Sequence, residues 1–241
     1  MKVTEKKLVE WIRKKVKEAN AKGVVFGLSG GIDSAVIAGL VKKAVGNNHL
    51  ALILPCHSSK HAASDARKVI KKFKLKSKAV DLTKVYDGFK KALPKGNKMA
   101  DANIKPRLRM ITLYHIANSL NYIVAGTGNK SELLVGYYTK HGDGGVDILP
   151  IADLFKAQVV ELANQLGVPK EIISKPPSAD LWHGQTDEEE MGVKYSDLDM
   201  ILAAMTSGKK VEASQEKIAK VKKMNKLSEH KRNLPEIFKI S

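Results

Sequence analysis

The sequence predicts an α/β protein with a doubly wound, mostly parallel sheet and helical extensions at its N- and C-terminal ends. Short apolar runs have the length of buried strands, and they lie at residues 23–28, 50–54, 78–80 and 122–125. Segments with helical spacing of apolar residues follow them, at residues 35–45, 62–73, 104–120 and 155–166. Strands that alternate with helices in this way are typical of a parallel sheet covered on both faces.

Both ends of the chain are expected to be helical. The first 20 residues are amphipathic, with one apolar stripe made by Val3, Leu8, Trp11, Ile12 and Val16. Near the other end, helical spacing predicts helices at residues 195–205 and 211–227. Two polar segments between these elements, residues 94–101 and 176–190, are expected to be mobile loops of the kind that close over active sites.

Charge and composition limit the classes of function. The 241 residues include 42 Lys and Arg against 25 Asp and Glu, a net charge of +17. Nucleic acid, an anionic membrane or phosphorylated small molecules would each suit this charge, and so would a solvated lysine-rich surface. No apolar run approaches the roughly 20 residues that span a bilayer, and we expect no signal peptide. A single cysteine, Cys56, excludes an intrachain disulfide and predicts a cytoplasmic location.

The segment VVFGLSGGIDSAVIAGL, residues 24–40, predicts an anion-binding turn between a strand and a helix. Such a turn presents free backbone N–H groups and the positive end of a helix dipole. Gly30 and Gly31 allow a phosphate to approach the backbone closely, and Ser29 and Ser34 add hydroxyl donors. The turn has neither the lysine of a Walker loop nor the G-x-G-x-x-G spacing of a dinucleotide-binding turn.

Asp33 is the most informative residue of this turn. It could cap the N-terminus of the following helix. However, a carboxylate beside a bound triphosphate would be repelled unless a cation lay between them. If the turn binds phosphate, Asp33 is therefore a Mg²⁺ ligand. A phosphate cradle without the Walker lysine suits a leaving pyrophosphate better than transfer of the γ-phosphoryl group.

The motif SGGIDS resembles the signature of the N-type ATP pyrophosphatases, or PP-loop enzymes, which cleave ATP between its α- and β-phosphates and have an adenine nucleotide alpha hydrolase-like fold. Further segments resemble the ammonia-dependent NAD⁺ synthetases of this superfamily, in the same order: NIKPRLRM at 103–110, GTGNKSELLVGYYTKHGDGGVDILPIADLFKAQV at 126–159, KPPSADLWHGQTDEEEMGVKYSDLDMIL at 175–202 and EHKRNLP at 229–235. The resemblance covers about residues 20–236.

The resemblance implies one catalytic domain over residues 1–241. Its parts would be an N-terminal helix at 1–20, a nucleotide-binding core at 21–175, and a mobile loop with a C-terminal helical segment at 176–241. The implied ATP-binding residues are Gly27, Leu28, Ser29, Gly30, Gly31, Ile32, Asp33, Ser34, Thr127, Lys156 and Ser178. The implied deamido-NAD⁺-binding residues are Arg107, Lys140, Asp147, His230 and Lys231.

The implied metal ligands are Asp33 and Glu132, with Mg²⁺ as the cofactor. Asp33, Lys156 and Asp187 have implied catalytic roles, in which Lys156 stabilises charge near the α–β bridge of ATP and Asp187 binds or deprotonates the incoming ammonium. Each assignment has an ordinary alternative. Glu132 could be an exposed acid in a first helical turn, Lys156 a surface lysine, and His230 and Lys231 members of a solvated basic tail.

Two features bear on the substrate contacts. The chain has 37 lysines but only five arginines, and the planar guanidinium of Arg107 or Arg109 suits phosphate or carboxylate better than an ammonium does. Of the two, only Arg107 stands at the family's contact position. The segment SSKHAASDA after the second strand retains one acid, Asp65, where members of the family often have several. The resemblance therefore defines the phosphate contacts better than those to adenosine.

The resemblance implies ATP-dependent amidation of deamido-NAD⁺ to NAD⁺ with ammonia. The reaction would pass through an acyl-adenylate and release AMP and pyrophosphate, in a cytoplasmic homodimer with no membrane or nucleic-acid partner. The sequence shows no amidase domain with a catalytic cysteine, although a separate glutaminase could supply the ammonia. Three alternatives remain at this stage: a tRNA-modifying adenylating enzyme, the ATP pyrophosphatase subunit of GMP synthetase, and a non-catalytic module that binds nucleotides or nucleic acid.

Overall fold

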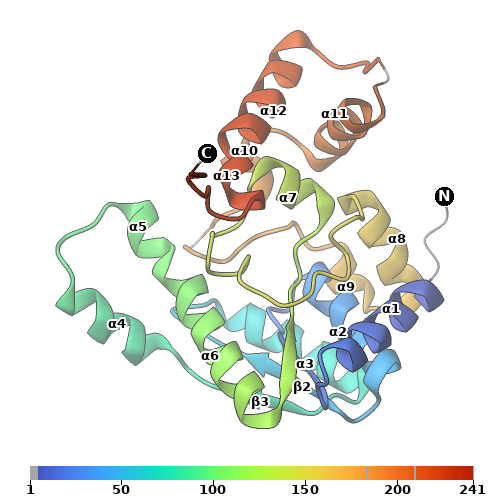
Figure 1. Cartoon of the computed structure of the whole chain (residues 1–241), viewed down its shortest axis with the longest axis vertical. Coiled ribbons are helices and arrows are strands. Elements are labelled where there is room, and N and C mark those ends of the chain that lie inside the picture. Colours follow the sequence, from blue (N-terminus) through green and yellow to red (C-terminus); the bar gives the residue numbers. More distant parts are fainter. Residues whose placement is uncertain (1–4, 183, 209, 241) are drawn as a thin grey trace.

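A computed structural model describes residues 5–182, 184–208 and 210–240, and it confirms the predicted α/β fold (Figure 1). Parallel strands form a four-stranded sheet in the order β3-β2-β1-β4. These strands are β1 (Gly23–Gly27), β2 (His49–Ile53), β3 (Ser77–Ala79) and β4 (Tyr122–Ala125). The chain steps from β1 through β2 to β3, and then crosses to the other side of β1 for β4. In open parallel sheets, ligands bind at the carboxyl ends of the strands beside such a reversal.

Helices cover both faces of the sheet. One face carries α1 (Glu5–Glu18), α2 (Ile32–Val45), α3 (Lys60–Phe73) and α8 (Lys156–Leu166). The other face carries α4 (Thr83–Ala92) and α6 (Ile104–Leu120). Side chains of β1 serve both cores, because Val24 and Phe26 point to the first face and Val25 to the second. Burial on two sides explains why this strand is an unbroken apolar run rather than an alternating one.

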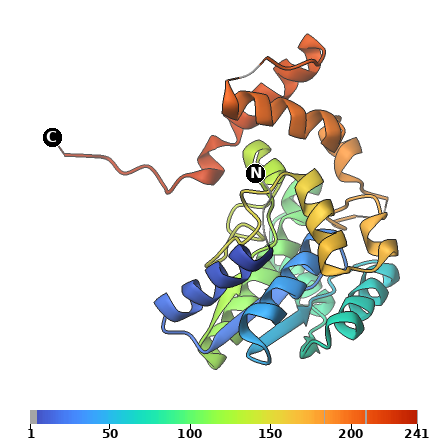
Figure 2. The ribbon, with the colours of Figure 1, turned by 90° about the vertical axis from the view of Figure 1, so that its right-hand side faces the viewer.

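The C-terminal part of the chain forms a separate helical layer above the carboxyl edge of the sheet (Figures 1 and 2). Apolar residues of α7 (Lys130–Val135), α11 (Tyr195–Ser207) and α12 (Gln215–Leu227) make a third core. Shorter helices complete the fold: α5 (Lys98–Ala102), α9 (Lys170–Ile173), α10 (Asp187–Met191) and α13 (Glu229–Arg232). Beyond α13 the chain extends away from the body (Figure 2).

The structure departs from the predicted elements in several places. In α1 the buried residues are Val9, Ile12 and Val16, whereas Trp11 is 36% exposed, with the Lys15 ammonium over its ring. Trp11 is one residue, about 100°, away from Ile12 around the helix, so both cannot face the core. Val3, the first member of the predicted stripe, lies outside the described residues.

The other departures concern where helices begin and which segments are helical. The predicted helix at 211–227 begins only at Gln215, because Ser214 caps it by accepting a hydrogen bond from the N–H of Lys217. The segments expected to be loops contain α5 and α10, and α4 was not predicted at all. Within the described residues, no helix combines the length and apolar character required to cross a membrane.

The packing of α1 gives a test of its register. Ile12 is fully buried against α2, so Ile12→Ala should lower the free energy of unfolding by about 2–5 kcal/mol. Trp11→Ala is the matched control, because it removes a larger side chain from the same helix at an exposed position. Chemical denaturation measures both variants. A larger loss for Trp11→Ala than for Ile12→Ala would contradict this orientation of the helix.

Candidate active site

The predicted glycine–serine turn joins the carboxyl end of β1 to α2. Gly31 is the N-cap residue of α2, and because it has no side chain, the first N–H groups of the helix are left without an N-cap side chain. The hydroxyl of Ser29 accepts a hydrogen bond from the N–H of Gly31 at 3.2 Å. The hydroxyl of Ser34 donates to the carbonyl of Gly31 at 2.9 Å. These bonds fix the conformation of the turn.

Gly30 is required by both its conformation and its surroundings. Its φ of +86° lies in the left-handed region. A Cβ atom at this position would lie 2.6 Å from the carbonyl oxygen of Ala62, at the start of α3. The glycine therefore allows the backbone of α3 to pack directly against the turn.

A buried cluster of one lysine and two acids lies beside this turn. Lys156, the first residue of α8, places its ammonium 2.6 Å from Asp33 Oδ2 and 3.4 Å from Glu132 Oε1. The Lys156 residue is only 5% exposed, so the alternative of a surface lysine is excluded. Asp33 does not cap α2, since Gly31 is the N-cap residue. Residues from three helices, far apart in the sequence, thus meet at the carboxyl edge of the sheet.

Helix capping holds these side chains in place. Asn129 is fully buried and caps α7, where its side-chain oxygen accepts from the N–H of Glu132 and the Glu132 carboxylate accepts from the N–H of Asn129. The side-chain amide of Asn129 donates to Asp33 Oδ1 at 2.9 Å. One residue therefore positions both acids.

A second set of contacts fixes the start of α8. The hydroxyl of Ser131 accepts from the N–H of Lys156 at 3.0 Å and donates to Asp199 Oδ1. The other carboxylate oxygen of Asp199, which belongs to α11, accepts from the N–H of Ala157 at 3.0 Å. An acid at a helix N-terminus also interacts favourably with the helix dipole. The C-terminal helical layer thus ties α7 and α8 together beside the site.

Asp187 and Tyr195 complete the cluster from the C-terminal layer. Asp187 is 4% exposed, and its Oδ2 accepts a hydrogen bond from the Tyr195 hydroxyl at 3.1 Å. Its Oδ1 has no hydrogen-bond partner in the described part of the chain. The Tyr195 hydroxyl also lies 3.4 Å from Glu132 Oε1, and the centre of its ring lies 5.0 Å from Lys156 Nζ.

Acids outnumber bases in this cluster. Burial, and then the charge of Asp33, raise the pKa of Glu132 to about 8 despite the attraction of Lys156. Burial raises the pKa of Asp187 more than Lys156 lowers it. Burial alone would lower the pKa of Lys156, but Asp33 and Glu132 outweigh this effect and raise it. The site therefore has more carboxyl groups than its one ammonium can pair with, and a bound cation would favour their ionised forms.

The residues present fit a magnesium ion that is shared with a substrate. Asp33 and Glu132 offer the carboxylate oxygens that this ion prefers, and Mg²⁺ usually binds through one or two carboxylates together with substrate phosphates. Residues 5–182, 184–208 and 210–240 contain no group of three or more His, Cys, Asp or Glu side chains arranged to hold a metal ion. A metal bound here would therefore need further ligands from the substrate or from water.

Four of the five predicted deamido-NAD⁺ residues lie together. Arg107 donates to the carbonyl of Lys140 at 3.3 Å, and the Lys140 ammonium donates to the carbonyl of His230 at 2.6 Å. Lys231 donates to the carbonyls of Gly136 and Tyr138, at 2.6 and 2.7 Å. The tail residues thus reach the loop that follows α7, so they do not form a detached basic tail.

Asp147 lies apart from that group. Its Oδ1 accepts from the Tyr114 hydroxyl at 2.9 Å and its Oδ2 from the N–H of Val124 at 2.7 Å. These bonds link the loop after α7 to α6 and β4, which is a structural role. Its contact with deamido-NAD⁺ remains a prediction. Arg109 also has structural partners, since it donates to the carbonyl of Leu54 and the hydroxyl of Ser58.

The remaining predicted ATP residues flank the turn. Thr127 follows β4, beside β1 at the same edge of the sheet. Ser178 lies in the segment before α10, and its hydroxyl accepts from the N–H of Asp180 at 3.1 Å. Asp180 in turn accepts from the N–H of Ser59 at 3.1 Å, so this segment contacts the start of α3. Asp65 of α3 is paired with Lys175 at 2.9 Å.

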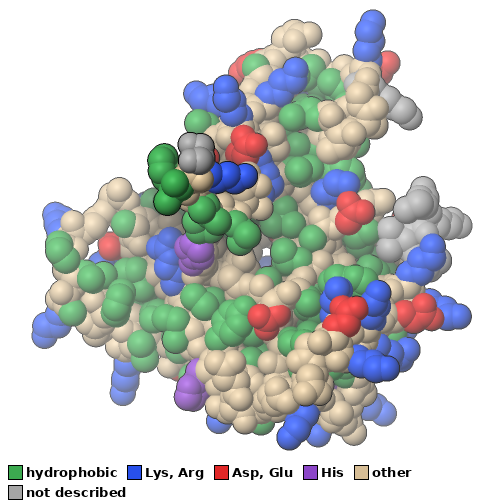
Figure 3. Space-filling model, viewed as in Figure 1, with side chains coloured by type: hydrophobic (Ala, Val, Ile, Leu, Met, Phe, Trp, Pro, Cys, Tyr) green, Lys and Arg blue, Asp and Glu red, His purple; other side chains and the backbone are tan. Residues whose placement is uncertain are grey.

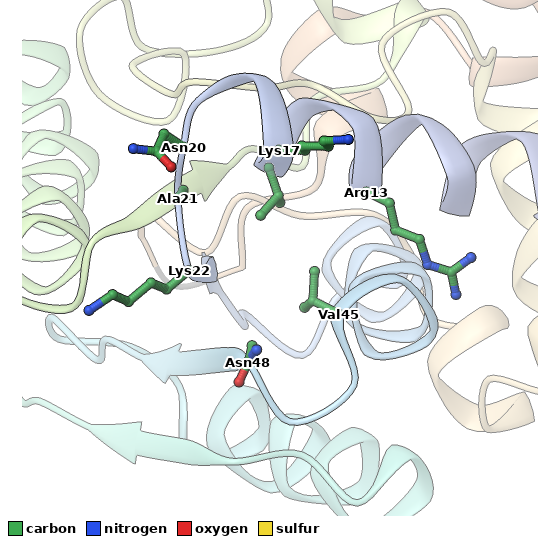
Figure 4. Close-up of a pocket in the computed structure, with 8 residues that line it drawn as sticks. Arg13, Lys17, Asn20, Ala21, Lys22, Val45 and Asn48 are labelled. Atoms are coloured by element: carbon green, nitrogen blue, oxygen red, sulfur yellow. The ribbon is translucent and has the colours of Figure 1, made fainter.

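A cavity of about 380 Å³ lies elsewhere, beside the amino ends of β1 and β2 (Figure 4). Val16 of α1 and Val45 of α2 line it, together with several polar residues. Its cations do not converge: Arg13 and Lys22 point to opposite sides, and Arg13 donates to the carbonyls of Ala44 and Lys43. This cavity is at the opposite edge of the sheet from the acidic cluster, and it is not part of the site.

The sequence analysis missed four residues that build the site: Asn129, Ser131, Tyr195 and Asp199. Asn129 could have been found, because an Asn three residues before a Glu is typical of a capping box. The other three had no such local signal. Their roles depend on how α11 packs against α7 and α8, which sequence spacing does not reveal.

The fold and the cluster define a nucleotide-binding α/β protein with an anion-binding turn of the PP-loop type. The model of the NAD synthase family matches residues 4–235, and the chain belongs to this family. NH3-dependent NAD⁺ synthetases from Carboxydothermus hydrogenoformans and Archaeoglobus fulgidus are 51% and 46% identical to it. The alignments cover 96% and 99% of this chain and 95% and 97% of those relatives.

Solved structures show the same relationship. The NMN synthetase of Francisella tularensis superposes with a TM-score of 0.90 at 39% identity, over 98% of this chain and 97% of that one. The NH3-dependent NAD synthetase of Campylobacter jejuni superposes with a TM-score of 0.85 at 32% identity, over the same shares of the two chains. The recognised family and the fold class are thereby confirmed.

The turn can be tested by substitution of its glycines. Gly30→Ala should destabilise the protein, because the new methyl group meets the backbone of α3 and the residue has a positive φ. Gly31→Ala is the matched control for folding, since its φ is −83° and the nearest atom to a new Cβ is 3.4 Å away. Thermal unfolding measures both variants. Equal melting temperatures would contradict the close approach of α3 to the turn.

The buried acids predict how stability depends on pH. Glu132 keeps its proton in the folded protein up to a pKa of about 8, whereas the unfolded chain loses it near the ordinary glutamate pKa of 4.5. The folded state therefore binds more protons between these values, and stability should fall as pH rises from about 5 to 8. Glu132→Gln, measured by thermal unfolding without metal or nucleotide, should flatten this slope. A wild-type protein that gains stability over this range would contradict the assignment.

Proposed function

We propose that this chain catalyses the ATP-dependent amidation of deamido-NAD⁺ to NAD⁺ with ammonia. The observation that carries the proposal is the buried Asp33–Lys156–Glu132 cluster beside the open turn, in a chain of the NAD synthase family. The nicotinate carboxylate attacks the α-phosphorus of ATP and pyrophosphate leaves. Ammonia then attacks the acyl-adenylate, so that AMP leaves, a proton is released and the carboxamide forms.

The turn and Lys156 serve the first of these steps. The N–H groups at the start of α2 face the phosphates of ATP, and the glycines allow close approach. Lys156 places a fixed positive charge near the bridge between the α- and β-phosphates, where negative charge develops as pyrophosphate leaves. Its pairing with Asp33 and Glu132 keeps the ammonium in place before the substrate binds.

Asp33 and Glu132 would hold the magnesium ion. The ion, when bound with ATP, neutralises the phosphate oxygens and favours departure of pyrophosphate. Without it, the repulsion between these acids and the phosphates would oppose binding. The proposal for Mg²⁺ is supported by the excess of acids over bases in the cluster.

Asp187 serves the second step. Its Oδ1 is buried and unpartnered in the described part of the chain, although buried acceptors are normally satisfied. An N–H of the incoming ammonium or ammonia would supply the missing donor. Arg107, Lys140, His230 and Lys231 supply a basic surface for the phosphates of deamido-NAD⁺, as the family resemblance implies.

We also propose that residues 1–241 form one catalytic domain that works as a homodimer in the cytoplasm. The face over α4–α6 carries exposed hydrophobic side chains (Figure 3). Five of them are between 44% and 57% exposed: Val85, Phe89, Leu93, Met99 and Ile111. A second copy would bury this apolar surface. The segment at 176–190, which includes the start of α10, would close over the site and exclude water from the adenylate.

A second candidate function is amidation of nicotinate mononucleotide. It is favoured by the similarity to the NMN synthetase of Francisella tularensis. Both activities use the same chemistry at the nicotinate carboxylate, and they differ in whether the substrate carries the adenylyl half. In this case the substrate would lack the adenylyl half, so fewer phosphate groups would contact the basic residues Arg107, Lys140, His230 and Lys231.

A turnover assay distinguishes the two candidates and tests the nitrogen donor. Purified protein with ATP and Mg²⁺ receives deamido-NAD⁺ or nicotinate mononucleotide, each with ammonium or with glutamine. We expect AMP, pyrophosphate and NAD⁺ in equal amounts with deamido-NAD⁺ and ammonium, and little product with glutamine. A higher kcat/KM for nicotinate mononucleotide would establish the second candidate instead. The absence of AMP with either substrate would refute both.

Two substitutions test the cluster. Lys156→Met should lower kcat by about 100- to 1,000-fold, because it removes the charge that stabilises the leaving pyrophosphate. Lys130→Met is the matched control, since Lys130 lies at the start of the neighbouring helix α7 and pairs with the exposed Asp153. AMP release measures both variants. Full activity of Lys156→Met would contradict the proposed role of this lysine.

Asp33→Ala should abolish AMP release. The variant should be less stable than wild type but still fold, because Glu132 remains 3.4 Å from the buried Lys156 ammonium. Circular dichroism checks the fold, and isothermal titration measures ATP binding with and without Mg²⁺. A variant that retains Mg²⁺-dependent ATP binding would contradict the proposed ligand role.

A further inference from the structure

The Tyr195 side chain contacts Glu132, Asp187 and Lys156 at the same time. We propose that Tyr195 is a positioning residue for the ammonia step: its hydroxyl holds Asp187 Oδ2, so that Oδ1 stays free to receive an N–H of ammonia or ammonium. This inference rests on the proposed function, because it assigns Tyr195 to one of the two half-reactions.

The Tyr195 side chain is held in place through its backbone and through its ring. Its backbone N–H donates to Glu188 Oε1 at 2.8 Å, which ties the first residue of α11 to α10, the helix that carries Asp187. Its ring packs in the third core with Leu198 and Ile201, and the residue is 6% exposed. A tyrosine side chain has only two rotatable bonds, so these contacts leave its hydroxyl little freedom.

The hydroxyl has one proton and two acidic neighbours. It lies 3.1 Å from Asp187 Oδ2 and 3.4 Å from Glu132 Oε1. A single O–H donates to one acceptor at a time in good geometry, and the shorter distance favours Asp187. The bond satisfies one oxygen of Asp187, and Oδ1 is buried and without a donor in the described part of the chain. The Tyr137 hydroxyl, a second phenol near Asp187, donates to Glu190 Oε2 at 2.8 Å.

The ring has a separate role. Its face lies 5.0 Å from Lys156 Nζ, a distance at which a cation and an aromatic ring attract each other. Removal of the hydroxyl alone would leave this contact intact. The two parts of the side chain therefore belong to different steps: the ring supports the lysine used in adenylation, and the hydroxyl orients the acid used with ammonia.

This division predicts different effects for two variants. Tyr195→Phe keeps the ring and should leave ATP–pyrophosphate exchange, measured with deamido-NAD⁺ but without ammonium, within about twofold of wild type. The same variant should lower kcat/KM for ammonium by about tenfold, the factor that corresponds to loss of one hydrogen bond to a charged group. Tyr195→Leu removes ring and hydroxyl and should lower both measurements. Tyr122→Phe, at the amino end of β4, is the matched control and should change neither.

The outcomes are distinguishable. Wild-type protein that shows no exchange with deamido-NAD⁺ would overturn the proposed function and this inference together. Wild-type exchange with a Tyr195→Phe variant that loses exchange and amidation equally, or that keeps its kcat/KM for ammonium, would overturn the inference alone. A structural role would produce the equal loss, because misplacement of α11 would disturb every step.

A double-mutant cycle gives a second, independent test of whether the hydroxyl acts through Asp187. Asp187→Asn should itself lower kcat/KM for ammonium. If the Tyr195 hydroxyl acts only through Asp187, its removal from this variant should not lower kcat/KM further. Adding Tyr195→Phe to Asp187→Asn should therefore change kcat/KM for ammonium by less than about twofold, since neighbouring residues of one network are not additive. Independent, multiplying effects would overturn the inference.

Discussion

The buried ion pair between Lys156 and Asp33 is the contact on which the site depends. Its 2.6 Å distance joins the first turn of α2 to the first residue of α8, two helices that lie side by side on one face of the sheet. Removal of one partner from such a pair typically costs about 3–5 kcal/mol, because the other charge is left buried and uncompensated. The pair is therefore maintained by the whole arrangement of α2, α7 and α8.

Helix N-termini bring the functional groups together. Asp33, Glu132, Lys156 and Asp187 all lie in the first turn of a helix, in α2, α7, α8 and α10. The three acids suit the positive end of a helix dipole, whereas Lys156 does not. Its unfavourable position is offset by Asp33 and Glu132 beside its ammonium and by Asp199, which accepts from the N–H of Ala157 in the same turn.

Local patterns were sufficient to predict the sheet and the position of the glycine–serine turn. The apolar run before SGGIDS and the glycines within it determine β1 and the conformation at Gly30, and neither depends on distant residues. The resemblance also named Glu132, Lys156 and Asp187, which the structure brings together. Tyr195 and Asp199 escaped prediction because their contacts with α7 and with Ala157 of α8 span more than 40 residues along the chain and exist only after α11 packs on these helices. Trp11 was misplaced for a related reason, since periodicity allows more than one stripe on a short helix and packing against α2 selects between them.

The buried acids of the cluster reduce the stability of the unliganded protein. Three carboxylates surround one ammonium, and burial already raises the pKa of Glu132 and Asp187. The acids of this site are incompletely paired with other protein groups, and under the proposed function a bound cation and substrate would stabilise their ionised forms. An apolar replacement would make the empty protein more stable, but it would remove the differential interaction with the bound state. Strain of this kind is expected where function rather than folding selects the residues. The C-terminal layer supplies Asp187 and Tyr195 from outside the sheet, so the acid with an unpartnered oxygen lies on a different layer of the fold from Asp33 and Lys156.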